Sequence, residues 1–270
     1  MGSVPEGHHS QYRGGRGSGV DSALSWLAGR ARRLSYRSYY RLVAVNYAHQ
    51  WLSTENRTHA GTFRSYELLN RHGSDPMLAE LDAVADSEAV IYDIGANVGV
   101  YSLALAAGEP DRRLVACEPA PRIQRQLRAN IAANAVDDRI EVLDCGVGAT
   151  NGSQRFYRST YPECSGFDRE SATRWGATVA DTAEVAVRRL DRLVDSHGLP
   201  DAVKIDVEGA APAVLRGARE TLQTHQPTLF IEIHEEGLST DVAGEVRELL
   251  RGVDYSIAER EGYLRCEPQD

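Results

Sequence analysis

The residues best suited to chemistry in this sequence form two short groups of ionisable side chains, each at the end of an apolar stretch. The first group, in the segment AVKIDVEG, consists of Lys204, Asp206 and Glu208. The second group, in the segment TLFIEIH, consists of Glu232 and His234. Because side chains two residues apart in a strand point to the same face, each group is predicted to share one face. Carboxylates and an imidazole gathered in this way can move protons or hold a cation.

Three roles are open for these side chains. Asp206, Glu208 and His234 are predicted to be catalytic, because acids at the end of an apolar strand contribute nothing to packing. Lys204 can act with them, or it can form a buried ion pair with Glu232 that holds neighbouring strands together, since an unpaired buried charge is costly. A divalent Mg or Mn ion held by the acids and the histidine is the least favoured of the three.

A second feature is a strand followed by a glycine turn, in the sequence VIYDIGANVG from Val90 to Gly99. The short β-branched run predicts a buried strand, and the small residues after it let a ligand approach bare backbone. A helix predicted to begin near Val98 points unpaired N–H groups toward the same place. A ligand-binding corner is one interpretation, and a turn that serves only packing is the other.

The next predicted strand favours the ligand-binding interpretation. Arg113–Cys117 is mostly apolar and is followed by Glu118 and Pro119, which places an acid 25 residues after Asp93. This is close to the spacing at which a βαβ unit brings a carboxylate to the hydroxyls of a ribose. The corner and Glu118 together therefore predict a site for a ligand that carries a nucleoside.

Composition narrows the partners and the compartment. The 270 residues include 42% hydrophobic side chains, enough for a large core, and carry a net charge of −9. Residues 1–57 hold eight arginines against three acids, so the body is acidic, which argues against broad nucleic-acid binding. Four widely spaced cysteines without a CxxC pair indicate neither a zinc site nor a disulfide framework. The sequence also has no apolar run of membrane-spanning length. Together with the cysteine pattern, this predicts a cytoplasmic protein whose thiols are reduced.

Strands and helices are predicted to alternate from residue 86 onward. Strands are expected at Val90–Ile94, Arg113–Cys117, Ile140–Cys145, Val185–Leu190, Ala202–Val207, Thr228–Ile233, Tyr255–Ala258 and Tyr263–Cys266, the last two joined at Glu261-Gly262. Right-handed crossovers then give an α/β, Rossmann-like, doubly wound fold. It has a mostly parallel seven-stranded sheet, helices on both faces and an antiparallel closing strand.

The N-terminal segments lie outside this pattern. Residues 1–19 lack apolar content and are predicted to be disordered. Residues 20–85 are predicted as a basic, helical arm, which packs on the main domain or lies on an anionic membrane surface. Its helices are expected at Asp21–Leu52, Thr62–His72 and Asp75–Ala85.

One internal segment, residues 150–184, also departs from the pattern. It gathers aromatic side chains and shows no clear helix or strand before Val185. So long an irregular segment in a compact domain is usually functional, so we predict a lid or substrate loop, with an edge hairpin as the alternative.

Five segments occur in an order and spacing that resembles the FkbM-type family of class I S-adenosylmethionine-dependent methyltransferases. They are YDIGANVGVYS, ACEPAP with Asn130 twelve residues after Glu118, VRRLDRLV, VKIDVEG followed by VLRGA, and FIEIH. The resemblance covers about Ala89 to His234 and implies that residues 86–270 form a methyltransferase domain.

The resemblance also implies a cofactor site. The methionine part of S-adenosylmethionine would be surrounded by Asp93, Gly95, Ala96, Asn97 and Gly99. The ribose hydroxyls would be held by Glu118, with Pro119 beside it, and the adenine would be bordered by Asp144 and Cys145. Similar proteins carry a further acid where this chain has Ala211, which leaves the chemistry near Glu208 less defined.

The reaction implied is O-methylation of a hydroxyl on a sugar, glycan, glycolipid or other secondary metabolite. The hydroxyl has to lose a proton, so we expect Asp206 to lie at the acceptor and His234 to act as base or orienting group. An NAD-dependent oxidoreductase is the alternative enzyme, although GANVG lacks the GxGxxG fingerprint. A non-catalytic cofactor-binding adaptor is a third interpretation. No nucleic-acid acceptor is expected, and the oligomeric state is left open.

Overall fold

The computed structural model describes residues 38–70, 72–234 and 240–269. The chain divides into two compact units, Met1–Leu42 and Val43–Asp270. Residues 1–19, which were predicted to be disordered, lie outside the described residues, and so does the first part of the predicted helix Asp21–Leu52. The described part of that helix is helical from 38 to 49.

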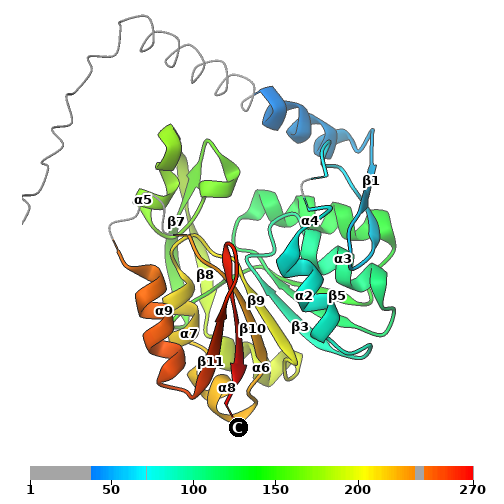
Figure 1. Cartoon of the computed structure of the whole chain (residues 1–270). Helices are drawn as coiled ribbons and strands as arrows, with labels where there is room; N and C mark the ends of the chain where they lie inside the picture. The colour runs from blue at the N-terminus through cyan, green and yellow to red at the C-terminus, as the bar shows by residue number, and fades with distance from the viewer. Residues whose placement is uncertain (1–37, 71, 235–239, 270) are drawn as a thin grey trace, which may run out of the picture. The chain divides into compact units, whose positions relative to one another are not determined.

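A seven-stranded sheet forms the centre of the second unit (Figure 1), as predicted. Its strand order is β11-β12-β10-β9-β3-β4-β5. The parallel strands are β3 (Val90–Ile94), β4 (Arg113–Cys117), β5 (Ile140–Leu143), β9 (Ala202–Ile205) and β10 (Thr228–Glu232). The predicted hairpin closes the sheet, because β12 (Tyr263–Pro268) runs antiparallel to both β10 and β11 (Tyr255–Glu259).

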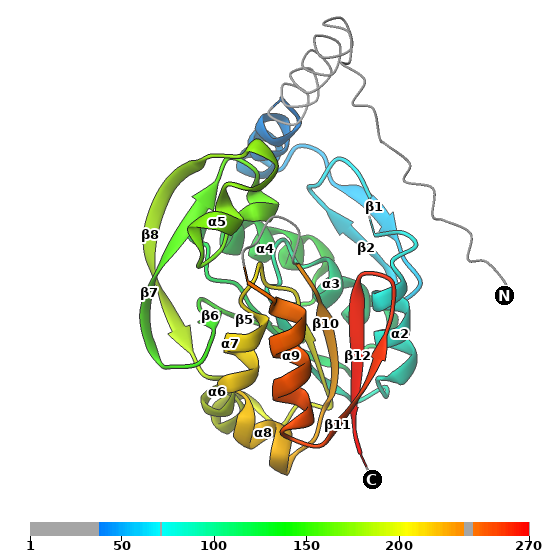
Figure 2. The same ribbon diagram turned by 60° about the vertical axis from the view of Figure 1, so that its left-hand side comes forward.

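Helices cover both faces of the sheet (Figure 2). One face carries α2 (Pro76–Val84), α3 (Val100–Gly108) and α4 (Pro121–Asn134), and the other carries α6 (Leu190–His197), α7 (Ala211–Arg216), α8 (Arg219–Thr224) and α9 (Val242–Arg251). Alternation along each strand fills two separate cores. In β3, Ile91 packs in the core under α2–α4, whereas Tyr92 and Ile94 pack in the core under α6–α9.

Residues from Val43 onward belong to the compact unit, so it includes most of the predicted N-terminal arm, residues 20–85. The helix predicted at Thr62–His72 is wrong, because β1 (Thr54–Arg57) and β2 (Thr62–Ser65) form an antiparallel hairpin. The side chain of Asn134 on α4 accepts from Arg64 N and donates to Arg64 O, both at 2.7 Å. It thus satisfies the free edge of β2 as a neighbouring strand would. The helix predicted at Asp75–Ala85 is confirmed by α2, which Asp75 caps.

The segment around residues 150–184 contains more regular structure than predicted (Figure 2). A three-stranded sheet joins β6 (Gly146–Val147), β8 (Val179–Arg188) and β7 (Gly152–Ser159) in that order. Short helical turns lie between β7 and β8: η1 (Pro162–Cys164), α5 (Arg169–Ala172) and η2 (Arg174–Gly176). The expectation of no clear element was wrong, because β7 and β8 pair antiparallel, as the hairpin alternative had it. A role as lid or substrate segment stays a prediction.

The segment after β9 forms two short helices, α7 and α8, with a break at Gly217. A Cβ atom at Gly217 would lie 2.0 Å from Gly148 O, so only glycine allows the two segments this approach. Among the described residues, no helix combines the length and hydropathy needed to cross a membrane. All four cysteines are described; each is buried and none is in a disulfide.

Candidate active site

The predicted corner forms at the end of β3, and its glycines are required by close contacts. Gly95 has φ of 77°, and a Cβ atom there would lie 2.0 Å from Asp206 O. Gly99 has φ of 89°, and a Cβ atom there would lie 2.3 Å from Leu127 Cδ1. The amides of Gly95 and Ala96 both donate to Cys117 O at 3.0 Å. The turn is therefore fixed against β4 and β9, and a side chain at either glycine would displace it.

Glu118 lies beside this turn, as predicted. Its carboxylate is nearly buried and accepts hydrogen bonds from Asn97 N at 3.1 Å and from Ala120 N at 2.7 Å. Burial raises the pKa of Glu118 to about 7, although these two backbone bonds favour the charged form. A carboxylate with only main-chain donors around it, next to a glycine turn, is suited to the hydroxyls of a ribose.

Asp93 and Lys204 form a buried ion pair beneath the turn. Lys204 Nζ lies 3.0 Å from Asp93 Oδ1, donates to Gly95 O at 3.0 Å and lies 3.4 Å from Asp206 Oδ2. The predicted pair between Lys204 and Glu232 was wrong. In the sheet register, Lys204 faces Asp93 on β3 and Phe230 on β10, so Glu232 lies two positions further along.

The carboxylate of Asp93 contacts Ser102 and Lys204. Its Oδ2 accepts from Ser102 Oγ at 2.7 Å and from Ser102 N at 3.3 Å, while Oδ1 faces Lys204. The side chain is 1% exposed. Asp93 therefore fixes the start of α3 and the glycine turn from below, and its effect on a ligand passes through them.

The residues predicted to border the adenine lie where β5 ends. Cys145 is buried, and its amide donates to Leu143 O at 2.9 Å. The side chain of Asp144 is exposed and lies 2.7 Å from Arg128 Nη2. Pro119 follows Glu118 at the end of the neighbouring strand β4.

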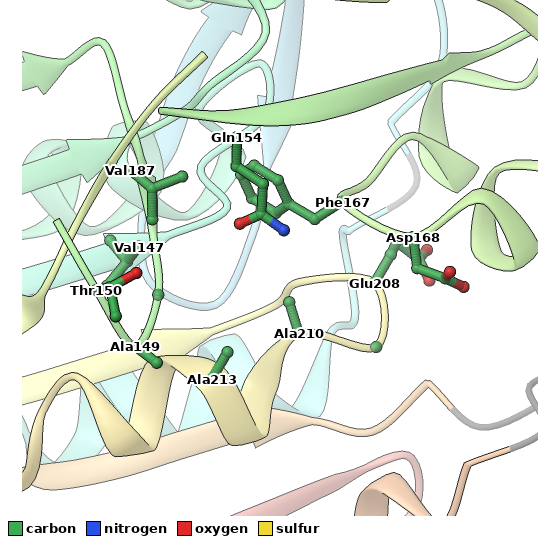
Figure 3. A pocket seen from close by; sticks show the side chains of 12 residues that line it. Val147, Ala149, Thr150, Gln154, Phe167, Asp168, Val187, Glu208, Ala210 and Ala213 are labelled. Atoms are coloured by element: carbon green, nitrogen blue, oxygen red, sulfur yellow. The ribbon is translucent and has the colours of Figure 1, made fainter. Parts of the chain in front are cut away.

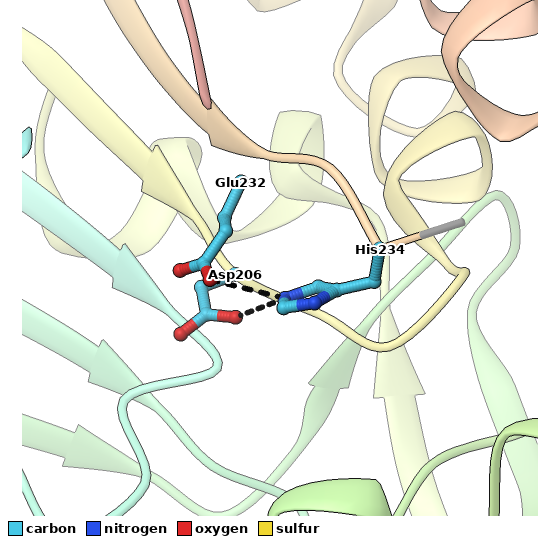
Figure 4. A group of neighbouring side chains, drawn as sticks. All are labelled: Asp206, Glu232 and His234. Atoms are coloured by element: carbon cyan, nitrogen blue, oxygen red, sulfur yellow. Dashed lines mark hydrogen bonds and ion pairs between the residues drawn. The ribbon is translucent and has the colours of Figure 1, made fainter. Parts of the chain in front are cut away.

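The acids and the histidine meet at the ends of β9 and β10, as predicted (Figure 4). His234 Nε2 lies 2.9 Å from Asp206 Oδ1 and 3.7 Å from Glu232 Oε1, and Nδ1 lies 3.9 Å from Glu208 Oε2. Burial disfavours a charged imidazole, but the bond to Asp206 and the three carboxylates raise the pKa of His234 to about 9. Burial opposes charge on Asp206 too, yet Lys204 and His234 hold the pKa of that carboxyl well below its usual range.

The same group of side chains has the composition of a metal site. Asp206, Glu232 and His234 each offer one ligand atom, and these atoms lie within 4.8 Å of one another. Lys204 Nζ, 3.4 Å from Asp206 Oδ2, already supplies a positive charge beside them.

Two side chains at the site were missed from the sequence. Arg174 of η2 has a nearly buried side chain that donates to Glu208 Oε2, and its guanidinium lies 4.8 Å from the ring centroid of Trp175. Nothing marks Arg174 in the sequence, because it lies in the segment whose path was not predictable. Tyr101 donates to Asp75 Oδ2 at 2.8 Å, and Lys204 Nζ lies 5.0 Å from its ring centroid. Tyr101 is part of YDIGANVGVYS, so its place in that segment was a usable signal.

The position where similar proteins carry an acid is closed in this chain. Ala211 is 1% exposed and packs in the core under α6–α9. The acidic groups of the site are therefore those of β9, β10 and their exits. Taken together, the glycine turn, the buried Glu118 and the carboxylate–imidazole group fit a ligand with a ribose and an amino acid, next to a second substrate.

Comparison with known proteins agrees with this arrangement. Residues 93–257 match the methyltransferase FkbM domain. The AMB antimetabolite synthetase AmbE of Pseudomonas aeruginosa is 28% identical over 216 residues, which are 67% of this chain and 10% of that protein. The chain thus spans a tenth of the length of AmbE.

Two further relatives match more of their own length. The 31-O-demethyl-FK506 methyltransferase FkbM of Streptomyces tacrolimicus is 28% identical over 62% of this chain and 73% of its own. The hexuronic acid methyltransferase AglP of Haloferax volcanii is 24% identical over 73% of this chain and 81% of its own.

Proposed function

Because the chain belongs to the methyltransferase FkbM domain family, we propose that it is an S-adenosylmethionine-dependent O-methyltransferase. One observation carries the proposal: the two halves of the site touch. Gly95 of the glycine turn lies against the main-chain carbonyl of Asp206, the residue that pairs with His234. The cofactor corner and the acid–base group therefore share one edge of the sheet, where open α/β sheets bind ligands.

The protein's main contribution is alignment. S-adenosylmethionine, when bound, supplies an electrophilic methyl group on a sulfonium. Glu118 would hold the ribose hydroxyls, and the Asp93–Lys204 pair would fix the turn on which the amino acid part rests. Because methyl transfer is an in-line displacement, holding the two reactants in register accounts for much of the rate.

His234 is the proposed base for the acceptor hydroxyl. In neutral His234, the Nε2–H group donates a hydrogen bond to Asp206 Oδ1. Nδ1 then carries the lone pair that accepts the proton of the acceptor hydroxyl. Asp206 orients the ring and stabilises the imidazolium that forms. With its pKa raised to about 9, His234 is mostly protonated at neutral pH, so deprotonation precedes turnover.

The acceptor is proposed to be a hydroxyl of a sugar, glycan or other secondary metabolite, in the cytoplasm. The names of two relatives support this class, since one is a hexuronic acid methyltransferase and the other acts on 31-O-demethyl-FK506. A basic N-terminal arm on a membrane surface would bring a lipid-linked acceptor within reach, and this contact stays a prediction.

The test is transfer of a labelled methyl group from S-adenosylmethionine to a hexuronic acid glycoside and to 31-O-demethyl-FK506. We expect label on oxygen of one acceptor, and loss of about 100- to 1000-fold in kcat for Asp206→Asn. The matched control is Asp195→Asn, which alters an exposed aspartate paired with Arg192 and should keep the wild-type rate. A fully active Asp206→Asn variant would contradict the assignment.

A further inference from the structure

An aromatic side chain of the β7–β8 segment lies at the edge of the cofactor site. Phe167 is half-buried and packs edge-to-face on Phe156, with ring centroids 5.3 Å apart. It also packs in the small cluster that contains Ala120, the residue that precedes α4. The Phe167 ring thus reaches from the β7–β8 segment to the end of β4.

The ring occupies the space of a missing side chain at Gly146. A Cβ atom on Gly146 would lie 2.4 Å from Phe167 Cζ, 2.8 Å from Phe167 Cε2 and 3.6 Å from Pro119 Cβ. Gly146 is not among the glycines with positive φ, so its backbone does not require glycine. The close approach of the Phe167 ring does.

Gly146 and Pro119 are neighbours of the residues assigned to the nucleoside. Glu118 N donates to Leu143 O at 3.2 Å, and Cys145 N donates to the same oxygen at 2.9 Å. The exits of β4 and β5 therefore run side by side, with Glu118-Pro119 on one and Cys145-Gly146 on the other. A ribose held at Glu118 would direct its base toward this pair of exits, where the Phe167 ring lies against Gly146.

We propose that Phe167 contacts the adenine of S-adenosylmethionine and contributes to cofactor affinity by stacking. This inference rests on the proposed function, because it needs the cofactor to bind at Glu118. The residues that the family motifs place around the cofactor all lie at the ends of strands of the main sheet. The inference adds a residue of the β7–β8 segment to them.

The surroundings of the ring support such a contact. Phe167 lines a cavity of about 260 Å³ together with Gln154 of β7 and Ala210 and Ala213 after β9 (Figure 3), so one side of the ring borders open space. The segment that carries it is anchored at Glu208: a Cβ atom on Gly166 would lie 3.3 Å from Glu208 Cβ, and Arg174 bonds the Glu208 carboxylate. The ring is therefore positioned by its own contacts with Phe156 and Gly146 and by the contacts of its segment with Glu208.

Calorimetric titration with S-adenosylhomocysteine tests the proposal on the full chain. We expect Phe167→Ala to weaken binding roughly 5- to 100-fold, the range for loss of one base–aromatic stack. Phe167→Leu, which keeps apolar volume without a ring, should lose affinity too, whereas Phe167→Tyr should retain it. Trp51→Ala is the control, because Trp51 is an aromatic residue outside the site, 74% exposed, and should leave affinity unchanged.

The outcomes separate this inference from the proposed function. If the wild-type chain fails to bind S-adenosylhomocysteine, both are overturned. If the wild type binds and Phe167→Ala or Phe167→Leu binds equally well or better, only the assignment of Phe167 is overturned. Thermal unfolding of each variant without ligand shows that a loss of affinity comes from a folded protein.

Discussion

The proposed cofactor corner and the proposed acceptor edge, which is formed by Asp206, Glu208, Glu232 and His234, are built in different ways. The corner is one continuous stretch, Val90–Gly99, and it works through main-chain groups that two glycines and a buried ion pair hold in place. The acceptor edge is made of side chains from β9, β10 and η2, which are distant in sequence and meet only in the fold. The comparison shows that a site made of backbone is encoded locally, whereas a site made of side chains depends on sheet register and loop path.

Removing the cation that joins the two regions should have the largest effect. Lys204→Met leaves Asp93 buried and unpaired and deprives Asp206 of its cation, so we expect a loss of about 3–5 kcal/mol in the free energy of unfolding. Urea unfolding measures it. The matched control is Arg192→Met, which breaks an exposed pair with Asp195 and should cost less than about 1 kcal/mol. Equal stabilities for the two variants would show that Lys204 does not join the regions.

The corner alone is tested by an alanine at Gly95. Gly95→Ala combines a positive φ with a clash against Asp206 O, so it should cost more than the roughly 1–2 kcal/mol of a left-handed residue and should abolish cofactor binding. Gly262→Ala has a similar positive φ of 88° with nothing within 4 Å, so it isolates the conformational cost. Unfolding and S-adenosylhomocysteine titration compare them. If the two variants behave alike, the contact between the two halves of the site is not required.

The acceptor edge is tested by its pH dependence. Because His234 has to be neutral to accept a proton and its pKa is raised to about 9, kcat/KM should rise about tenfold per pH unit above neutrality and level off near that value. His234→Gln should have low activity without this rise. A wild-type profile that is flat above pH 7 would exclude His234 as the base.

Stability should respond to pH with the opposite sign. The folded pKa of His234 lies above the usual 6.5, so its pairing stabilises the fold fully below pH 6.5 and is lost as the pH rises through about 9. The bond to Asp206 contributes on the order of 1.5–3 kcal/mol when charged. The difference in unfolding free energy between wild type and His234→Gln should shrink accordingly from pH 6 to pH 9.

The smallest expected effect is that of a chelator. Lys204 already places a positive charge 3.4 Å from Asp206, so we expect the acid–base group to work without a divalent ion and the rate to be unchanged in EDTA. Loss of activity in EDTA that Mg or Mn restores would instead assign Asp206, Glu232 and His234 to a metal.

The success of the sequence predictions follows the same division. The mostly parallel seven-stranded sheet, the closing hairpin and the positions of Gly95 and Glu118 were predictable, because alternation of strands and helices and local spacing indicate them. The partner of Lys204 was not, since the sequence does not state which residue of β3 or β10 lies opposite it. The contact of Arg174 with Glu208 joins residues 34 positions apart through an irregular segment, and no periodicity encodes such a contact.

The hairpin of β1 and β2 shows a second reason why part of the fold could not be predicted from the sequence. Asn134 of α4 satisfies the edge of β2 and Asn130 accepts from Tyr66 just after it, and these partners lie 70 and 64 residues further along the chain. Local propensity alone therefore favoured a helix at Thr62–His72.

Calorimetry with S-adenosylhomocysteine and with NAD tests the central claim most directly, because the alternative enzyme class would use the same glycine corner. We predict that the wild-type chain binds S-adenosylhomocysteine and not NAD, and that Glu118→Gln weakens this binding about tenfold by removing a charged acceptor from the ribose hydroxyls. Binding of NAD alone would contradict the account.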